Sequence, residues 1–366
     1  MKYILCGGGT GGHVMPAIAI ADEIKKRDKN AVFLFIGRKN GRENQATLDR
    51  GYKLSELEVY GLSFKINKEN LKRAYKTLTS IKAAKELIIS FKPDVIIGTG
   101  GYVCFPVIRA GAALKIPCFI HESNSVAGRT TKSVQSLCEQ VFTGFPHCEG
   151  LKKRTKTSFT GTPVRREFMK RSREQSRHAL KIPDGKFFVL SFGGSGGAEK
   201  FNNIMLEVIN KSEDPEIEFM HISGERYYPE LSKHFIGKRN AGVYPYIKNI
   251  ADYMSAADLI ICRAGALTIS EIGYLNKAAI LIPSPNVKNN HQFKNADAVS
   301  KAGAAILLNE KKLTSKALLL EIEELKGDGA LLSSLSKNCS LNTKKNSGEI
   351  IAREITNYLS NLSAPK

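Results

Sequence analysis

Several features that would assign a chain to a class at once are missing from this sequence. It has no tryptophan, no Cys-x-x-Cys pair and no His/Cys cluster or Asp-x-Asp motif. The seven cysteines are dispersed and odd in number, which is typical of reduced thiols in a cytosolic protein, and we expect no bound metal. The most apolar stretch, residues 95–108, is interrupted by glycines and a proline and falls short of the ~20 residues that a spanning helix needs. We therefore expect a soluble protein whose membrane contact, if any, is peripheral.

Acidic residues are scarce relative to basic ones. Lysine and arginine number 55 against 35 aspartates and glutamates, for a net charge of +20 over 366 residues. A field of this sign favours anionic partners such as nucleotide-sugars, pyrophosphate lipids, nucleic acid or an anionic membrane face. The basic residues are dispersed and no stacking aromatics interleave them, so nucleic acid is disfavoured.

Glycine, in contrast, is concentrated in two turns that each follow a short apolar strand. The first turn is residues 7–12 after the strand 3–6, and the second is residues 193–197 after the strand 187–192. A strand, a glycine turn and a helix together direct backbone N–H groups and the positive end of a helix at a phosphate. Two such turns, one domain apart, predict two nucleotide-binding folds that face one cleft.

Strands and helices alternate in both halves, which predicts two doubly wound Rossmann-like α/β domains. The domains are expected at residues 1–162 and 163–345, with a basic, polar linker inside 161–185. A final amphipathic helix within 346–366 is expected to cross back onto the first domain. The expected strands are 3–6, 31–36, 95–97, 117–120 and 140–143 in the first half, and 187–192, 218–222, 242–246, 259–262, 279–283 and 305–308 in the second.

The first turn also satisfies the Gly-x-Gly-x-x-Gly fingerprint of dinucleotide-binding domains. That fingerprint expects an acidic residue at the end of the second strand, where this chain has Arg38. Arg38 suits a 2′-phosphate, so an NADP-dependent oxidoreductase remains the alternative function. This alternative leaves the second glycine turn unexplained.

Polar residues follow several strands at the edge where ligands bind in open α/β sheets. His13 closes the first turn near a helix start, which favours a neutral imidazole and so suits a general base. His121 and Glu122 follow the strand 117–120, and Glu271 lies in the first turns of a helix that starts after the strand 259–262. Each has an ordinary structural reading as well, as a capping residue or loop polarity.

The segment 62–92 is strongly basic, with eight lysines and arginines against two glutamates, a net of +6. Most of its apolar residues fall on one helical face that we expect to pack on the sheet. Phe64 and Ile66 precede that helix among lysines, and with Lys72 and Arg73 they form a candidate contact with an anionic membrane surface.

The ordered set of strings resembles the MurG family of UDP-N-acetylglucosamine transferases, which complete the lipid-linked peptidoglycan precursor. The resemblance covers nearly the whole chain and is carried by residues 8–13, 98–102, 121–124, 161–165, 193–195, 263–271 and 292–296. It implies the two-domain GT-B fold and an inverting, metal-independent glycosyltransferase. It further implies an undecaprenyl-linked acceptor and a peripheral place on the cytoplasmic side of the bacterial plasma membrane.

The resemblance also assigns roles residue by residue. His13 matches the proposed base for the C4 hydroxyl of the acceptor, and Ile247 a contact of the uracil. Donor or substrate contacts are implied for Thr10, Gly11, Gly12, Asn124, Arg165, Ser195, Ala266, Leu267, Thr268, Ile269, Ser270, Glu271 and Gln292. The acceptor side is implied to include Gly101, Tyr102, His121 and Glu122. No cofactor is implied.

The chain departs from the family pattern in two places. Gly196 stands where the family usually has glutamine, which puts one donor contact in doubt. The loop 286–292 is one residue longer than in some relatives, so either His291 or Gln292 holds the matching role. With no tryptophan available as a membrane anchor, Phe64, Ile66 and the neighbouring lysines remain the candidates.

Overall fold

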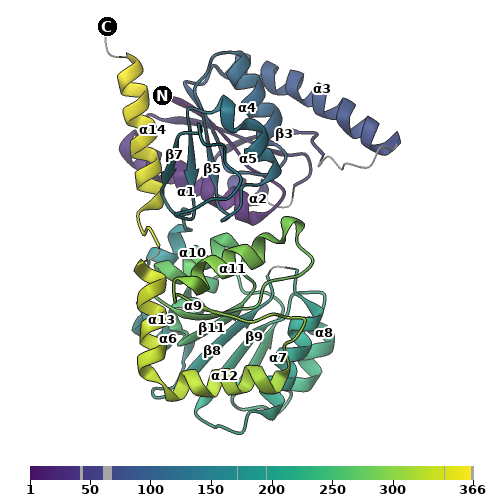
Figure 1. Ribbon diagram of the computed structural model, residues 1–366, viewed down its shortest axis with the longest axis vertical. Helices are drawn as coiled ribbons and strands as arrows, with labels where there is room; N and C mark the ends of the chain where they lie inside the picture. Colours follow the sequence, from purple (N-terminus) through teal and green to yellow (C-terminus); the bar gives the residue numbers. More distant parts are fainter. Residues whose placement is uncertain (42–43, 61–67, 171, 195, 342, 364–366) are drawn as a thin grey trace. The chain divides into compact units, whose positions relative to one another are not determined.

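The chain forms two compact α/β units (Figure 1). The computed structural model describes residues 1–41, 44–60, 68–170, 172–194, 196–341 and 343–363. Unit 1 consists of Met1–Arg165 with Lys345–Lys366, and unit 2 of Arg166–Lys344. The sequence places the first boundary at residue 162 and the structure places it at 165. Each unit is built on its own all-parallel sheet.

The sheet of unit 1 has seven strands in the order β3-β2-β1-β4-β5-β6-β7. Its strands are β1 (Lys2–Cys6), β2 (Val32–Arg38), β3 (Lys53–Leu57), β4 (Val95–Gly98), β5 (Cys118–Glu122), β6 (Gln140–Thr143) and β7 (Thr157–Phe159). Its helices are α1 (Gly11–Arg27), α2 (Asn44–Leu48), α3 (Lys68–Phe91), α4 (Cys104–Ala113), α5 (Arg129–Val134), η1 (Gln135–Leu137) and α14 (Ser347–Ser363). The neighbouring strands β2, β1 and β4 are mostly apolar, as expected for a sheet covered on both faces.

The order of strands changes direction between β1 and β4. From β1 the chain builds outward through β2 and β3, and it then returns to place β4 on the other side of β1. Cys6 pairs with Gly98 in this register, so the turns that follow β1 and β4 begin side by side. Such a switch point is where open α/β sheets bind ligands.

The sheet of unit 2 has six strands in the order β10-β9-β8-β11-β12-β13, with the same kind of switch between β8 and β11. Its strands are β8 (Phe187–Phe192), β9 (Ile217–Ile222), β10 (Ala241–Tyr244), β11 (Leu259–Cys262), β12 (Ala278–Leu281) and β13 (Ile306–Leu307). Its helices are η2 (Arg166–Met169), α6 (Arg173–Leu180), α7 (Glu199–Lys211), α8 (Tyr228–Leu231), η3 (Ser232–Phe235), α9 (Ile250–Ala256), α10 (Ala266–Tyr274), η4 (Lys288–Asn290), α11 (His291–Lys301), α12 (Ser315–Gly327) and α13 (Gly329–Leu341).

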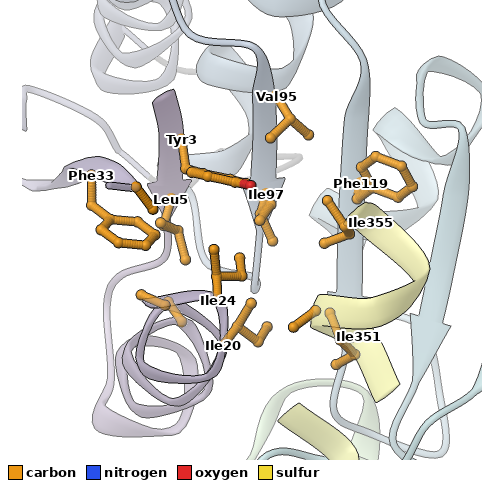
Figure 2. Packing of buried hydrophobic residues seen from close by; sticks show 14 of the residues in the cluster. Tyr3, Leu5, Ile20, Ile24, Phe33, Val95, Ile97, Phe119, Ile351 and Ile355 are labelled. Carbon is orange, nitrogen blue, oxygen red and sulfur yellow. The ribbon is translucent and has the colours of Figure 1, made fainter. Parts of the chain in front are cut away.

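The last helix, α14, belongs to the core of unit 1. Ile351 and Ile355 pack against the same cluster as Ile20 and Ile24 of α1, under the sheet strands (Figure 2). Two hydrogen bonds from the sheet reach Glu354, one from Gln140 Nε2 at 2.6 Å and one from Ser158 Oγ at 2.9 Å. The helix therefore completes one layer of unit 1 from the far end of the chain.

Three elements differ from the sequence-based expectation. The edge strands β3 and β7 were not predicted, because both are short and partly exposed and lack the apolar run of a central strand. The polar stretch expected to be a linker contains α6, which belongs to unit 2. This helix begins with a full capping box, in which Ser172 and Gln175 each accept a hydrogen bond from the other's backbone N–H.

We predict that Ile355→Ala lowers the free energy of unfolding of unit 1 by about 3 kcal/mol, because the side chain is fully buried and leaves a cavity. Hydrogen exchange of the β1 and β4 amides under native conditions measures the loss. Leu362→Ala on the same helix is the control, because Leu362 is 59% exposed and its truncation should change stability by less than about 0.5 kcal/mol. Equal effects of the two changes would contradict the packing of α14 in this core.

Candidate functional site

The turns after β1 and β4 meet at the switch point of unit 1. Gly8 N–H donates to the Gly100 carbonyl at 3.3 Å. Gly101 has a φ of +84°, and a Cβ at this position would lie 1.8 Å from the Gly8 oxygen. Only glycine allows backbones to approach this closely. The two turns therefore form one surface at the carboxyl edge of the sheet. Thr10 and Gly11 are exposed on this surface.

His13 lies in the first turn of α1 on this surface. Its Nδ1 is 3.1 Å from the Thr99 carbonyl oxygen. Because a carbonyl only accepts, Nδ1 carries a hydrogen, and in the neutral ring the lone pair is then on Nε2. The imidazole is half-buried and is presented by a glycine turn, as predicted. A neutral histidine in this tautomer can take a proton at Nε2.

His121, which the resemblance implies for the acceptor side, is fully buried. Its Nε2 donates to the Gly161 carbonyl at 2.9 Å, and Nδ1 lies 3.3 Å from Ser123 Oγ. Burial lowers the pKa of His121 to about 4, so the ring is neutral near pH 7. Nε2 thus links β5 to the segment after β7, while Nδ1 contacts the turn that directly follows β5, and the ring is enclosed by the protein.

Glu122 is also turned inward, with 5% of its surface exposed. Its carboxylate accepts from Asn124 N at 3.1 Å, Asn124 Nδ2 at 3.0 Å, Gly128 N at 2.8 Å and Thr131 Oγ1 at 2.6 Å. These four bonds hold the segment 122–131 and orient the Asn124 carboxamide. Glu122 shapes the rim of the site through Asn124, while Tyr102, 42% exposed, stands open to solvent beside Gly101.

The second glycine turn, after β8, is built on the same principle in unit 2. Gly194 and Gly197 have φ values of +95° and +69°. A Cβ on Gly197 would lie 2.1 Å from the Ser223 oxygen, and one on Gly224 would lie 2.7 Å from Gly197 N. The turns after β8 and β9 are therefore in backbone contact. Gly196 is exposed within this turn, and Ser195 lies outside the described residues.

A buried polar chain lies under the second turn. Ser191 Oγ is 2.8 Å from His221 Nδ1, His221 Nε2 is 3.1 Å from Asn202 Oδ1, and Asn202 Nδ2 donates to the Ser223 carbonyl at 2.9 Å. Burial lowers the pKa of His221 to about 3, so the ring is neutral. These hydrogen bonds connect β8, β9 and α7 directly beneath the glycine turn.

The helix α10 follows β11 with its N-terminus at the switch point of the unit 2 sheet. Arg263, just before it, donates to the Ile282 carbonyl at 3.0 Å and forms a buried ion pair with Glu310. Asn295 Nδ2 donates to the Ala264 carbonyl at 3.3 Å. These contacts fix the turn that presents the first N–H groups of α10, which have no partner within the helix.

Glu271 lies one turn into α10 and is turned away from solvent. It is the sixth residue of the helix and is 2% exposed. Ala266, Ile269 and Ser270 are also buried, whereas Leu267 and Thr268 are half-buried. The partly exposed residues of this motif are therefore Leu267 and Thr268, in the first turn of the helix.

The remaining candidates lie at a helix start and in a loop of unit 2 and at the end of unit 1. Gln292 is in the first turn of α11 beside His291, and its Oε1 accepts from Ser284 N at 2.8 Å. This bond assigns the oxygen and identifies Nε2 as the donor end of the amide. Ile247 is half-buried in the loop after β10, and Arg165 is half-buried at the end of unit 1.

The candidate membrane contact falls largely outside the part of the chain that the structure describes. Phe64 and Ile66 lie outside the described residues, and Lys72 and Arg73 lie on α3 at positions whose side chains are not described. Nearby, Lys76 pairs with Glu58 and lies over the Tyr60 ring, 4.9 Å from its centroid. Within the described ranges no helix is long and apolar enough to cross a membrane.

The sequence analysis missed residues that hold the predicted site segments in place. Thr99, Asn202 and Glu310 were given no role, although each contacts a predicted site segment. A polar residue on an apolar face, such as Asn202 between Phe201 and Met205, is the signal available in the sequence. Among the described residues, no group of three or more His, Cys, Asp or Glu side chains is arranged to hold a metal ion.

Comparison with known proteins assigns both units to one family. The model of the glycosyltransferase family 28 N-terminal domain matches residues 3–143, and that of the family 28 C-terminal domain matches residues 188–350. A relative from Thermoanaerobacter sp. (strain X514) is 40% identical over 361 residues, covering 97% of this chain and 99% of the relative. One from Halalkalibacterium halodurans is 42% identical over 328 residues, covering 89% and 90%. Both are named UDP-N-acetylglucosamine--N-acetylmuramyl-(pentapeptide) pyrophosphoryl-undecaprenol N-acetylglucosamine transferase.

Solved structures agree with this assignment. Acinetobacter baumannii MurG superposes with a TM-score of 0.78 at 26% identity, covering 97% of this chain and 99% of that chain. A UDP-GlcNAc 2-epimerase from Neisseria meningitidis, at 14% identity and a TM-score of 0.69, shares the fold over 98% of this chain and 100% of its own. The glycosyltransferase matches span both glycine turns, whereas the oxidoreductase alternative accounts only for the first. The chain therefore belongs to glycosyltransferase family 28 and, within it, to the MurG family of N-acetylglucosamine transferases.

Proposed function

We propose that the chain transfers N-acetylglucosamine from UDP-N-acetylglucosamine to the C4 hydroxyl of an undecaprenyl-linked N-acetylmuramyl-pentapeptide. One observation carries the proposal: His13 stands at the switch point of unit 1 with Nδ1 bound to the Thr99 carbonyl, in a chain whose two halves match family 28. Relatives at about 40% identity carry the name of this reaction.

The reaction needs a base on the acceptor side and charge stabilisation on the donor side. The acceptor oxygen forms a bond to the anomeric carbon as the bond from that carbon to the UDP oxygen breaks. The acceptor proton passes to His13 Nε2, and UDP leaves with the electron pair. Attack opposite the leaving group inverts the anomeric centre.

Unit 2 supplies the donor site in this proposal. The N-terminus of α10 faces the diphosphate, because helix N–H groups and the helix dipole stabilise the charge that develops on UDP. Ribose contacts come from the segment 266–271, the uracil contact from Ile247 and the sugar contact from Nε2 of Gln292. Ser195 and Gly196 extend this site from the second glycine turn.

Unit 1 supplies the acceptor side. Thr10 and Gly11, which are exposed, and Gly12, which is half-buried, line it beside His13, with Tyr102 open to solvent next to Gly101. Asn124, oriented by Glu122, and Arg165 complete the polar groups proposed to contact substrate. The polyisoprenoid part of the acceptor stays in the bilayer, so the enzyme must dock on an anionic membrane surface.

Docking is proposed to use Phe64 and Ile66, which precede α3 in the sequence, together with Lys72 and Arg73 of α3. Burying two such apolar side chains contributes a few kcal/mol, roughly, and each basic residue near an anionic leaflet about 1 kcal/mol. Binding of this strength is reversible and weakens as salt screens the surface charge. The proposed place is the cytoplasmic face of the plasma membrane, where UDP-sugars are available.

The proposed reaction predicts transfer of labelled N-acetylglucosamine from the UDP-sugar to a lipid-linked N-acetylmuramyl-pentapeptide. UDP should also raise the melting temperature of the protein, because a ligand of the folded state stabilises it by mass action. NADPH at the same concentration is the control and should leave the melting temperature unchanged. Stabilisation by NADPH alone, without transfer, would instead favour the oxidoreductase.

We predict that His13→Ala lowers kcat by about 10² or more while the affinity for UDP stays within twofold, because the imidazole acts on the acceptor proton. Steady-state transfer assays and UDP titration measure the two quantities. His234→Ala is the matched control, since His234 is exposed on η3 in unit 2. Normal turnover by His13→Ala would remove His13 as the base.

We predict that the triple change Phe64→Ser, Lys72→Glu and Arg73→Glu releases the protein from anionic vesicles, because it removes an apolar contact and reverses two charges. Transfer to a short-chain soluble acceptor should be largely retained. Vesicle sedimentation at low and high salt measures the binding.

A triple change of the same kind in unit 2 tests whether the effect is local. Ile236→Ser, Lys238→Glu and Arg239→Glu alter net charge by the same amount, and Ile236 is 83% exposed. This control should stay bound to vesicles. Release of both variants would show that total charge decides binding, and release of neither would place the docking surface elsewhere.

A further inference from the structure

Thr99 contacts His13 at two points from the neighbouring strand. It is the first residue after β4 and is 1% exposed. Its carbonyl lies 3.1 Å from His13 Nδ1, and its Oγ1 lies 2.7 Å from the His13 main-chain oxygen. A hydroxyl has one hydrogen to donate, and Thr99 Oγ1 is closer to the His13 oxygen than to the Cys6 oxygen, which lies at 3.3 Å. The Thr99 hydroxyl therefore donates to the His13 oxygen. One residue therefore binds both the ring and the backbone of His13.

The space around this pair is filled. A Cβ on Gly100 would lie 2.4 Å from His13 Nδ1, and a Cβ on Gly7 would lie 2.3 Å from Thr99 Oγ1. Gly100 has a φ of +107°, a conformation that favours glycine. The imidazole therefore lies directly over the Gly100 backbone, which restricts the rotamers open to it.

Cys104 holds the segment 99–100, which contacts His13. Gly100 N–H lies 3.3 Å from Cys104 Sγ, and Sγ lies 3.0 Å from the Gly100 oxygen and 3.1 Å from the Cys6 oxygen. Thr99 N–H also donates to the Cys6 oxygen at 2.9 Å. The direction of the Thr99 carbonyl is thus set by the strand pairing of β1 with β4.

We propose that Thr99 is a positioning residue for the reaction: its carbonyl selects the tautomer of His13 with the lone pair on Nε2, and its hydroxyl holds the first turn of α1 that carries the ring. This inference rests on the proposed role of His13 as the base. The carbonyl dipole also stabilises the imidazolium that forms when Nε2 takes the acceptor proton. Thr99 contacts no reacting atom and acts only through His13.

The test is a double-mutant cycle. Thr99→Val keeps the shape and removes the hydroxyl, and it should lower kcat about 10- to 100-fold with KM for the UDP-sugar within twofold. Thr99→Ser keeps the hydroxyl and should restore kcat to within threefold of wild type. Combining Thr99→Val with His13→Ala should cost no more than His13→Ala alone, because one change acts through the other. Multiplicative losses, or a Thr99→Val enzyme with wild-type kcat, would overturn the proposal.

A direct readout separates this proposal from the function itself. In protein labelled with 15N-histidine, the His13 signals, identified by their absence in His13→Ala, should show the Nδ1–H tautomer in wild type and also in Thr99→Val, because the substitution keeps the Thr99 main-chain carbonyl. An Nε2–H tautomer, or a mixture of tautomers, in the wild-type protein would overturn the positioning role of the carbonyl. If His13→Ala keeps full activity, the base assignment fails while the tautomer measurement still reports on Thr99.

Two further variants control for misfolding of Thr99→Val. Thr143→Val removes another buried threonine hydroxyl from the same unit, one that lies 3.4 Å from the Ser158 carbonyl, and it should leave kcat unchanged. If Thr99→Val does not fold, Thr99→Ala takes its place, because it adds no bulk. An equal loss of kcat in Thr143→Val and the Thr99 variant would show a general effect of stability and contradict the proposal.

Discussion

The close approach of two backbone turns at the switch point of unit 1 is the constraint on which the proposed active site depends. The parallel pairing of β1 and β4 aligns Cys6 with Gly98, so both turns leave the sheet at the same height. Glycine at positions 7, 100 and 101 is required because a Cβ would collide with the opposite turn. The place of His13 follows from this approach, since the ring lies over Gly100 and binds the carbonyl of Thr99.

Unit 2 meets the same constraint with an additional support. Its glycine turn contacts the turn after β9 through Gly197 and Gly224, and beneath it lies a chain of side-chain hydrogen bonds through His221 and Asn202. A buried network of this kind is rigid and holds both loops in place. Each unit thus presents one rigid backbone surface made by glycine contacts between turns, and in unit 2 a buried network supports it from below.

The sequence predicted those parts of the fold and site that depend on local pattern. Strand, glycine turn and helix are adjacent in the chain, so both turns and His13 could be found without the structure. The edge strands β3 and β7 carry too little apolar character to stand out. His121 and Glu122 follow a strand as ligand-binding residues do, yet they point inward, and only the partners Gly161 and Thr131 reveal this direction. The role of Thr99 depends on a residue 86 positions away.

The packing of α14 has a consequence for the order in which the chain acquires structure during synthesis. Ile351 and Ile355 complete the core of unit 1, whereas unit 2 is a continuous segment that ends at residue 344. The ribosome therefore releases all of unit 2 before the first unit has its last layer. Domains of most multidomain chains fold from the N-terminus as they emerge. Here the second unit can close first, and the half that carries His13 stays incomplete until α14 has been synthesised.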